Sequence, residues 1–267
     1  PHAAYTVDPE YMRELWEIKH QLNRKYGSAN HSIIWHIHAA ETDDEAEKIR
    51  KAFGVHFTGG VLEYLDSLNV LGNDVVAAHC VNLTKKDVET VARKGVKVSH
   101  NPISNLKLGS GVSPVPKLLE AGTTVSLGTD SSCSNNSSDM FEVMKTAALL
   151  HKGVNRDPTL VPAEQILRMA TIEGAKALLW DREIGSIEVG KDADLVLIDF
   201  RKPHLCPVFN EISHLVYSAK SSDVDTVLVK GKIVMENRVV GTLNADHILT
   251  LAKKTKERLL SKLHERS

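Results

Sequence analysis

Two histidines and a glutamate follow one apolar stretch of the chain, Ser32-Ile-Ile-Trp-His-Ile-His-Ala-Ala-Glu-Thr42. Its β-branched start favours a buried strand, and His36, His38 and Glu41 stand where that strand would run into a loop. A neutral imidazole is a good zinc ligand, and a carboxylate three residues further on can move protons beside the metal. The alternative is structural: alternation places His36 and His38 on one strand face, where both imidazoles need hydrogen-bond partners.

Two later apolar stretches also end in residues that bind metals. Val75-Val-Ala-Ala-His79 closes with a histidine, and Thr124-Val-Ser-Leu-Gly-Thr-Asp130 closes with an aspartate. Each has a local alternative, since His79 can be satisfied by its neighbours and Asp130 can cap the following helix. Packing alone does not explain why three separate strands end in this way. Histidine, histidine and aspartate at successive strand ends are typical of a metal site.

Other polar stretches carry weaker signals. His100, in the sequence His-Asn-Pro, indicates either pocket lining or, preferably, a hydrogen-bonded loop. The polar run 131–138 lacks the glycine and lysine of a phosphate-binding P-loop, so helix capping or hydrogen bonds to a polar substrate are better interpretations. The chain has no Gly-x-Ser-x-Gly motif, which argues against a serine nucleophile of the α/β-hydrolase type.

The elements that must position these residues alternate between helix and strand. Periodicity and end signals predict helices over 9–26, 43–53, 61–68, 85–94, 114–121, 139–151, 162–170 and 172–179, and strands over 32–38, 74–79, 96–100 and 123–128. Such alternation implies a parallel sheet with right-handed crossovers. Four units are half of an eight-unit (β/α) barrel, in which the carboxyl ends of the strands carry the chemistry.

The pattern changes after Trp180. Residues 184–199 predict short antiparallel strands with glycine turns, and residues 226–235 predict a hairpin that turns at Lys230-Gly231. A charged amphipathic helix is predicted over 244–264, with a solvated face. We therefore expect a partial barrel over 1–182, a small β-sandwich portion over 183–242 and a C-terminal helix over 243–267.

Composition excludes several classes of protein. Of 267 residues, 42% are hydrophobic and 25% charged, with a net charge of −1, as in an ordinary globular protein. We therefore expect no nucleic-acid partner and no membrane partner, and no apolar run is long enough to span a bilayer. Three widely spaced cysteines and no signal peptide predict a cytoplasmic protein. Because the chain opens Pro1-His-Ala-Ala-Tyr5, we expect the C-terminal part of a longer protein.

Taken together, the motifs resemble one family across essentially the whole chain. In order they are His-x-x-Glu-Thr, Ala-Ala-His-Cys, Ser-His-Asn-Pro-x-Ser-Asn-x-Lys-Leu, and Leu-Gly-Thr-Asp followed by Ser-Asn-Asn. This order is similar to the amidohydrolase superfamily, within it to the branch of 5′-methylthioadenosine/S-adenosylhomocysteine deaminases and chlorohydrolases. The resemblance implies an α/β metal-dependent hydrolase with a TIM barrel, here its C-terminal half with strands four or five to eight, and a small β-sandwich.

The resemblance also implies catalytic roles. His38 and Asp130 would bind one Zn²⁺ per subunit, with Fe²⁺ or Mn²⁺ as alternatives. Glu41 would contact the substrate and shuttle protons, and His79 would polarise the attacking water or the tetrahedral intermediate. Asp130 would also take the proton from that water. The implied assembly is a homo-oligomer.

His2 and Ser134 are implied to line the substrate pocket. The implied reaction is hydrolytic deamination of an adenosine-type nucleoside, with 5′-methylthioadenosine or S-adenosylhomocysteine as the leading small-molecule substrates. The alternatives within the superfamily are a guanine or cytosine deaminase and an s-triazine chlorohydrolase. Thr42 stands where a guanine deaminase would favour asparagine.

The family's first metal motif, a His-x-His on barrel strand one, is absent from this chain. We interpret His36-Ile-His38 as part of strand five instead, because Glu41-Thr42 and the later Ala-Ala-His fit that position. A missing N-terminal segment is therefore expected to complete the metal site. The remaining alternative is an inactive truncated fragment.

Overall fold

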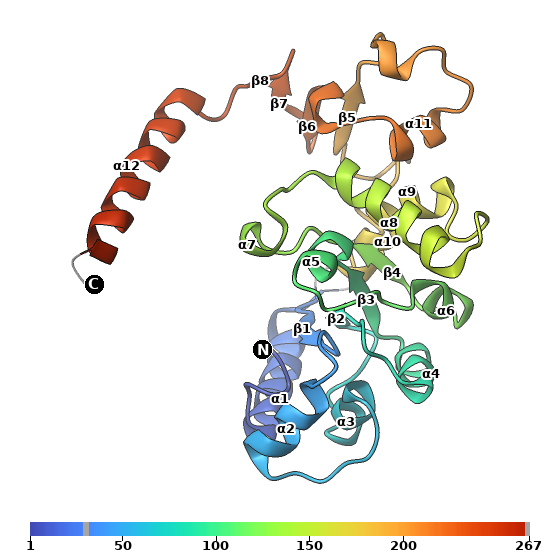
Figure 1. Ribbon diagram of the computed structural model, residues 1–267, viewed down its shortest axis with the longest axis vertical. Helices are drawn as coiled ribbons and strands as arrows, with labels where there is room; N and C mark the ends of the chain where they lie inside the picture. Colours follow the sequence, from blue (N-terminus) through green and yellow to red (C-terminus); the bar gives the residue numbers. More distant parts are fainter. Residues whose placement is uncertain (29–31, 265–267) are drawn as a thin grey trace. The chain divides into compact units, whose positions relative to one another are not determined.

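The computed structural model describes residues 1–28 and 32–264, which form two compact units. The first unit comprises residues 1–191 and 203–221, and the second comprises residues 192–202 and those from 222 onwards. Each unit contains one four-stranded sheet (Figure 1).

The sheet of the first unit is parallel, with its strands in chain order. They are β1 (Trp35–Ala39), β2 (Val75–His79), β3 (Lys97–His100) and β4 (Val125–Leu127). Burial alternates along β1: Ile37 is buried in the core, whereas His36 is exposed and His38 half-buried on the other face. The alternation therefore turns both histidines away from the helix-covered side of the sheet.

Helices connect these strands and continue the first unit after β4. They are α1 (Pro9–Tyr26), α2 (Glu45–Phe53), α3 (Val61–Ser67), α4 (Lys85–Lys94), α5 (Pro102–Lys107), α6 (Val115–Glu120), α7 (Ser132–Asn135), α8 (Met140–Asn155), α9 (Ala163–Ala170), α10 (Ile172–Ala177) and α11 (Glu211–Tyr217), with a 3-10 turn at Pro203–Leu205. Local signals set several ends. Asp8 accepts a hydrogen bond from the amide of Glu10 at the start of α1. Thr84 and Asp87 form a capping box on α4, which ends at Gly95 in the left-handed conformation.

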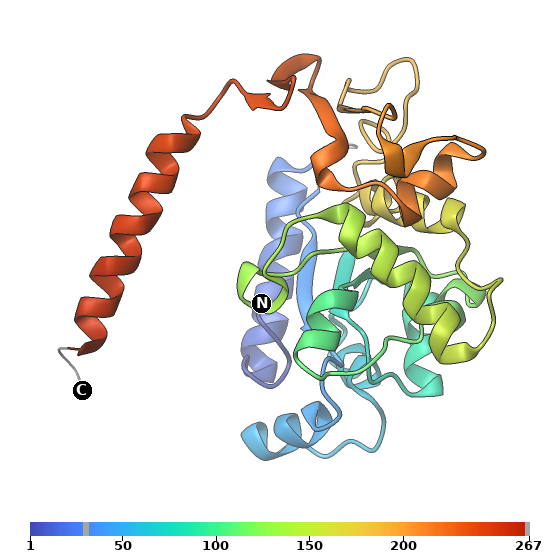
Figure 2. The same cartoon turned by 45° about the horizontal axis from the view of Figure 1, so that its top comes forward.

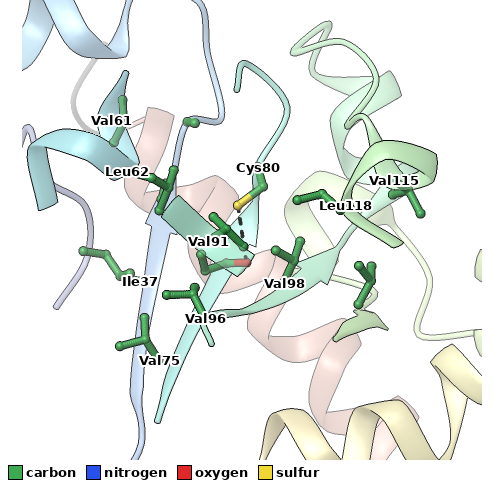
Figure 3. Close-up of a cluster of buried hydrophobic side chains, with 14 of the residues drawn as sticks. Ile37, Val61, Leu62, Val75, Cys80, Val91, Val96, Val98, Val115 and Leu118 are labelled. Carbon is green, nitrogen blue, oxygen red and sulfur yellow. Dashed lines mark hydrogen bonds between the residues drawn. The ribbon is translucent and has the colours of Figure 1, made fainter. Parts of the chain in front are cut away.

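A hydrophobic core fills the space between the sheet and helices α3, α4 and α6 (Figure 3). Ile37, Leu62, Val91, Val98 and Leu118 are each at most 1% exposed. Burying one such side chain contributes about 1.5–3 kcal/mol. This core holds β1 to β3 in place and so fixes where their carboxyl ends lie. Helix α1 runs beside β1 (Figure 2), and Trp16 of the helix contacts Trp35 of the strand edge-on.

The helices differ from prediction at four places. One is α11, which lies where the sequence predicted a small β-sandwich portion. α5 follows His100 directly, and α7 lies within the polar run 131–138, where the sequence predicted loops. The hydroxyl of Ser131 accepts a hydrogen bond from the amide of Ser134, 3.3 Å away, and so caps α7. α8 continues past the predicted end at residue 151, because the chain stays helical until Arg156 adopts the left-handed cap.

The second unit is an antiparallel sheet followed by a helix. Its elements are β5 (Leu195–Ile198), β6 (Val224–Val229), β7 (Lys232–Glu236), β8 (Val239–Val240) and α12 (Ala245–His264), with a 3-10 turn at Ser221–Asp223 leading into β6. The hairpin predicted to turn at Lys230-Gly231 and the predicted last helix are confirmed.

The strands predicted over residues 184–194 are wrong. This stretch forms turns and irregular chain, because Gly185 and Gly190 both take positive φ and interrupt any extended pairing. The division at residues 182 and 242 stays a prediction. Among the residues that the structure describes, no helix is long and apolar enough to cross a membrane.

Candidate metal centre

Three candidate residues come together at the carboxyl edge of the parallel sheet. One ligand atom each from His38, His79 and Asp130 lies within 4.8 Å of the other two. His38 is on β1, His79 ends β2, and Asp130 follows β4. The imidazole rings of His38 and His79 are stacked, with 5.3 Å between centroids. Residues far apart in sequence therefore form one cluster with two nitrogen donors and one carboxylate.

The backbone at this cluster takes conformations that are uncommon for residues other than glycine. His79 has φ +73° and Asp130 has φ +59°, both in the left-handed region. Such positions cost about 1–3 kcal/mol each and persist where tertiary packing over-determines them. At both positions the backbone departs from the strand conformation and the side chain joins the cluster.

His38 is oriented by the first residues of the chain. Its Nδ1 lies 2.8 Å from the backbone carbonyl oxygen of His2, and its backbone amide donates to the same oxygen over 3.0 Å. A carbonyl oxygen only accepts, so Nδ1 carries the proton and Nε2 keeps its lone pair. This is the arrangement that a metal-binding histidine needs.

His79 is almost completely enclosed, with 1% of its surface exposed. Its Nδ1 lies 2.8 Å from the side-chain oxygen of Asn105. Its Nε2 has no hydrogen-bond partner among the described residues and lies 3.9 Å from a carboxylate oxygen of Glu41. An unpartnered buried nitrogen beside an acid is a site where a ligand or a water molecule is needed.

Asp130 is held by two serine hydroxyls. Ser104 donates to Oδ2 over 2.7 Å, and Ser134 donates to the same oxygen over 2.5 Å. Burial raises the pKa of Asp130, but these two hydrogen bonds outweigh burial and leave the pKa below its usual value. The carboxylate is therefore ionised at neutral pH, the form in which an aspartate binds a cation.

A pocket of about 340 Å³ opens beside the cluster. Its lining residues lie on the strands of the parallel sheet or just after them. They are His36, Ile37, His38, Ala78, Ser99, Asn101, Gly128 and Asp130. Gly128 is required there, because a Cβ at this position would lie 2.3 Å from the side-chain oxygen of Asn101.

The structure brings four of the predicted site residues together, namely His38, Glu41, His79 and Asp130. Ser134 contacts this cluster through its hydroxyl, which donates a hydrogen bond to Asp130. Neither Ser134 nor His2 belongs to the lining of the pocket of about 340 Å³ among the described residues, and their substrate-binding role stays a prediction.

Sequence reasoning assigned no role to Ser104 or Asn105, although both lie in the motif Ser-His-Asn-Pro-x-Ser-Asn that carried the resemblance. Their contacts are formed with His79 and Asp130, each 26 positions away in the sequence. No local pattern marks them as supports of the cluster.

A parallel α/β sheet with two histidines and an aspartate at its carboxyl edge is typical of metal-dependent proteins of the barrel class. The Amidohydrolase family matches residues 1–234, and the chain belongs to this family. The predicted family is therefore confirmed.

The chain is 45% identical over 262 residues to the 5-methylthioadenosine/S-adenosylhomocysteine deaminase of Pelotomaculum thermopropionicum, covering 98% of this chain and 57% of the relative. It is also 45% identical to the 5′-deoxyadenosine deaminase of Methanosarcina mazei, over 99% of this chain and 58% of that protein. The crystal structure of an adenosine deaminase from Xanthomonas campestris with bound zinc superimposes with a TM-score of 0.90 at 34% identity, covering 98% of this chain and 56% of that one.

The predicted fold class is confirmed by these comparisons and by the parallel and antiparallel sheets. The chain spans somewhat more than half the length of the relatives it matches, 57% and 58% for the two deaminases above.

Proposed function

We propose that this chain carries the catalytic cluster of a metal-dependent deaminase that hydrolyses the exocyclic amine of an adenosine-type nucleoside. The observation that carries the proposal is the convergence of His38, His79 and Asp130 within 4.8 Å, with Glu41 beside His79. The names of the relatives support 5′-methylthioadenosine, S-adenosylhomocysteine or 5′-deoxyadenosine as substrates.

The donor set fits a zinc ion. His38 offers a lone pair on Nε2, Asp130 is an ionised carboxylate, and the buried Nε2 of His79 lacks a partner among the described residues. Zinc takes such nitrogen and oxygen donors, and iron or manganese are the alternatives. We propose that His38 and Asp130 are ligands, and that a segment outside residues 1–267 supplies the remaining ones, as the greater length of the relatives supports.

Zinc held by His38 and Asp130 would lower the pKa of a water molecule beside it to about 7. Asp130 then accepts a proton from the attacking water, and His79 accepts a hydrogen bond from it through Nε2. Glu41 delivers a proton to the ring nitrogen as the new carbon–oxygen bond forms at C6. The Glu41 carboxylate then takes the proton of the new hydroxyl group at C6 and passes it to the exocyclic amine, which leaves as ammonia when the carbon–nitrogen bond breaks. The proton held by Asp130 returns to Glu41 and restores the starting state.

We further propose that the protein is cytoplasmic and homo-oligomeric. The cysteines Cys80, Cys133 and Cys206 are all free, which suits a reducing compartment.

The test compares the chain alone with a fusion, which we call the completed protein. In this fusion the chain is joined to the part of the Pelotomaculum relative that the match leaves uncovered. We expect about one zinc per completed protein by elemental analysis, and ammonia release from 5′-methylthioadenosine. Asp130→Asn should lose both the zinc and the ammonia release. The control Glu47→Gln, at an exposed position on α2, should keep both. If the completed protein instead releases ammonia from guanine or cytosine, or dechlorinates an s-triazine, and does not turn over the nucleoside, that activity takes the place of the proposed one. A completed protein that binds no metal would refute it.

A further inference from the structure

Two consecutive residues of α5 reach two different members of the metal cluster. Ser104 donates to Oδ2 of Asp130 over 2.7 Å, and the side chain of Asn105 lies 2.8 Å from Nδ1 of His79. Ser104 and Asn105 are at most 1% exposed. Water therefore does not compete for these contacts, and the protein alone decides how the two cluster residues are held.

The contact of Asn105 has a chemical consequence that the contact of Ser104 lacks. A neutral imidazole carries one proton on two nitrogens, and the partner of one nitrogen decides which nitrogen is protonated. The atom of Asn105 that faces Nδ1 is the amide oxygen, which only accepts a hydrogen bond. Nδ1 must therefore hold the proton, and the unpartnered Nε2 holds the lone pair.

Hydrogen bonds connect helix α5 to neighbouring segments of the chain. The amide of Asn105 donates to the carbonyl of Asn101 over 3.0 Å, and Lys107 donates to the carbonyl of Cys133 over 2.7 Å. The second contact joins α5 to α7, the short helix that carries Ser134. The same short helix thus contacts both His79 and the residues around Asp130.

We propose that Asn105 is a positioning residue that holds neutral His79 in the tautomer with the proton on Nδ1, so that Nε2 presents its lone pair to the metal centre. The catalytic meaning of this role rests on the proposed function. The tautomer itself does not, because it follows from one buried contact within the chain.

The test uses the metal-free chain labelled with ¹⁵N-histidine, at about pH 8.5, where an ordinary imidazole is neutral. Long-range ¹⁵N–¹H correlations distinguish a proton on Nδ1 from one on Nε2, and His79→Gln identifies the signals of His79. We expect Nδ1–H in the natural chain and in Asn105→Asp, which keeps an accepting oxygen. Asn105→Ala should lose that preference, and Leu106→Ala, an exposed neighbour on α5, should leave the spectrum unchanged.

A second readout separates this role from simple packing. In the completed protein, Asn105→Ala should lower kcat roughly 10- to 100-fold with little change in KM, as for other residues that orient metal-site histidines, and Asn105→Asp should restore most of the loss. Nε2–H in the natural chain would overturn the inference whatever the activity. If the completed protein does not deaminate the nucleoside but His79 keeps its proton on Nδ1, the proposed function is overturned and the positioning role of Asn105 is still supported.

Discussion

The Nε2 atoms of His100 and His151 face each other at 3.1 Å, and neither side chain is exposed. His100 ends β3 and His151 lies on α8, so this contact ties the sheet to the helix that follows the metal cluster. One ring must donate and the other accept, so at least the accepting imidazole is neutral. Burial is the main cause that lowers the pKa of His151 to about 4 and that of His100 well below its usual value.

This pair predicts that the folded chain loses stability in mild acid. In the unfolded chain a histidine binds a proton below about pH 6.5, whereas folded His151 does so only below about pH 4. The unfolded state thus binds more protons between these values, and stability falls as pH falls through that window. The loss from His151 alone is about 3 kcal/mol.

Urea denaturation at about pH 7.5 and about pH 5 checks this prediction. His151→Gln should show a smaller decrease in unfolding free energy between the two pH values than the natural chain. His56→Gln, at an exposed position, is the matched control. Equal pH dependence in His151→Gln and the natural chain would show that the pair is not responsible.

Glu45 predicts the opposite pH dependence. It is 1% exposed, and its Oε2 accepts a hydrogen bond from the amide of Glu41 over 2.8 Å. Burial raises the pKa of Glu45 to about 7. The unfolded chain releases this proton first, near the ordinary glutamate pKa of 4.5, so stability is lost as pH rises from there to about 7, by about 3 kcal/mol. We compare the unfolding free energy of Glu45→Gln with that of the natural chain in urea denaturation. The variant should be no more stable than the natural chain at about pH 4.5, and the difference should shift in favour of the variant at about pH 8.

Asp87 is expected to be one of the most sensitive positions for folding. Its Oδ1 accepts from the amides of Leu62 and Glu63 at 2.9 and 3.0 Å, and its Oδ2 accepts from the amide and hydroxyl of Thr84, both at 2.9 Å. One buried carboxylate therefore caps both α3 and α4. Asp87→Ala should cost about 2–4 kcal/mol in urea denaturation, because several buried amides lose their acceptor. Thr84→Ala should cost about 1 kcal/mol. A loss in Asp87→Ala no larger than that in Thr84→Ala would contradict the double capping role.

Glu41 should be needed for turnover and not for metal binding. Its backbone is fixed on both sides, since its amide donates to Glu45 and its carbonyl accepts from Asn82 over 3.0 Å. In the completed protein, Glu41→Gln should lower kcat for nucleoside deamination about 10²- to 10⁴-fold, the usual contribution of an acid–base residue. Zinc content should stay unchanged by elemental analysis. Full activity in this variant would assign proton transfer to another group.

Features set by neighbouring residues could be predicted from the sequence. The capping of α1 by Asp8, the box of Thr84 and Asp87, and the stop at Gly95 each depend on residues within a few positions. The alternation of helix and strand implied the parallel sheet, and its strand ends implied the cluster of His38, His79 and Asp130. The short helices α5, α7 and α11 were missed, because one or two turns give too little periodicity to be recognised in the sequence.

Contacts between distant residues were decided only by tertiary packing. Asn105 meets His79, Ser104 meets Asp130, and His100 meets His151 across 51 positions. Each pairing depends on how strand ends and helices are set by the buried core, and no local pattern in the sequence encodes it. The sequence by itself determined which residues bring metal-binding chemistry to the sheet edge. Packing determined which nitrogen of His79 is left free and how the carboxylate of Asp130 is held, because those properties follow from hydrogen bonds that exist only once the sheet has formed.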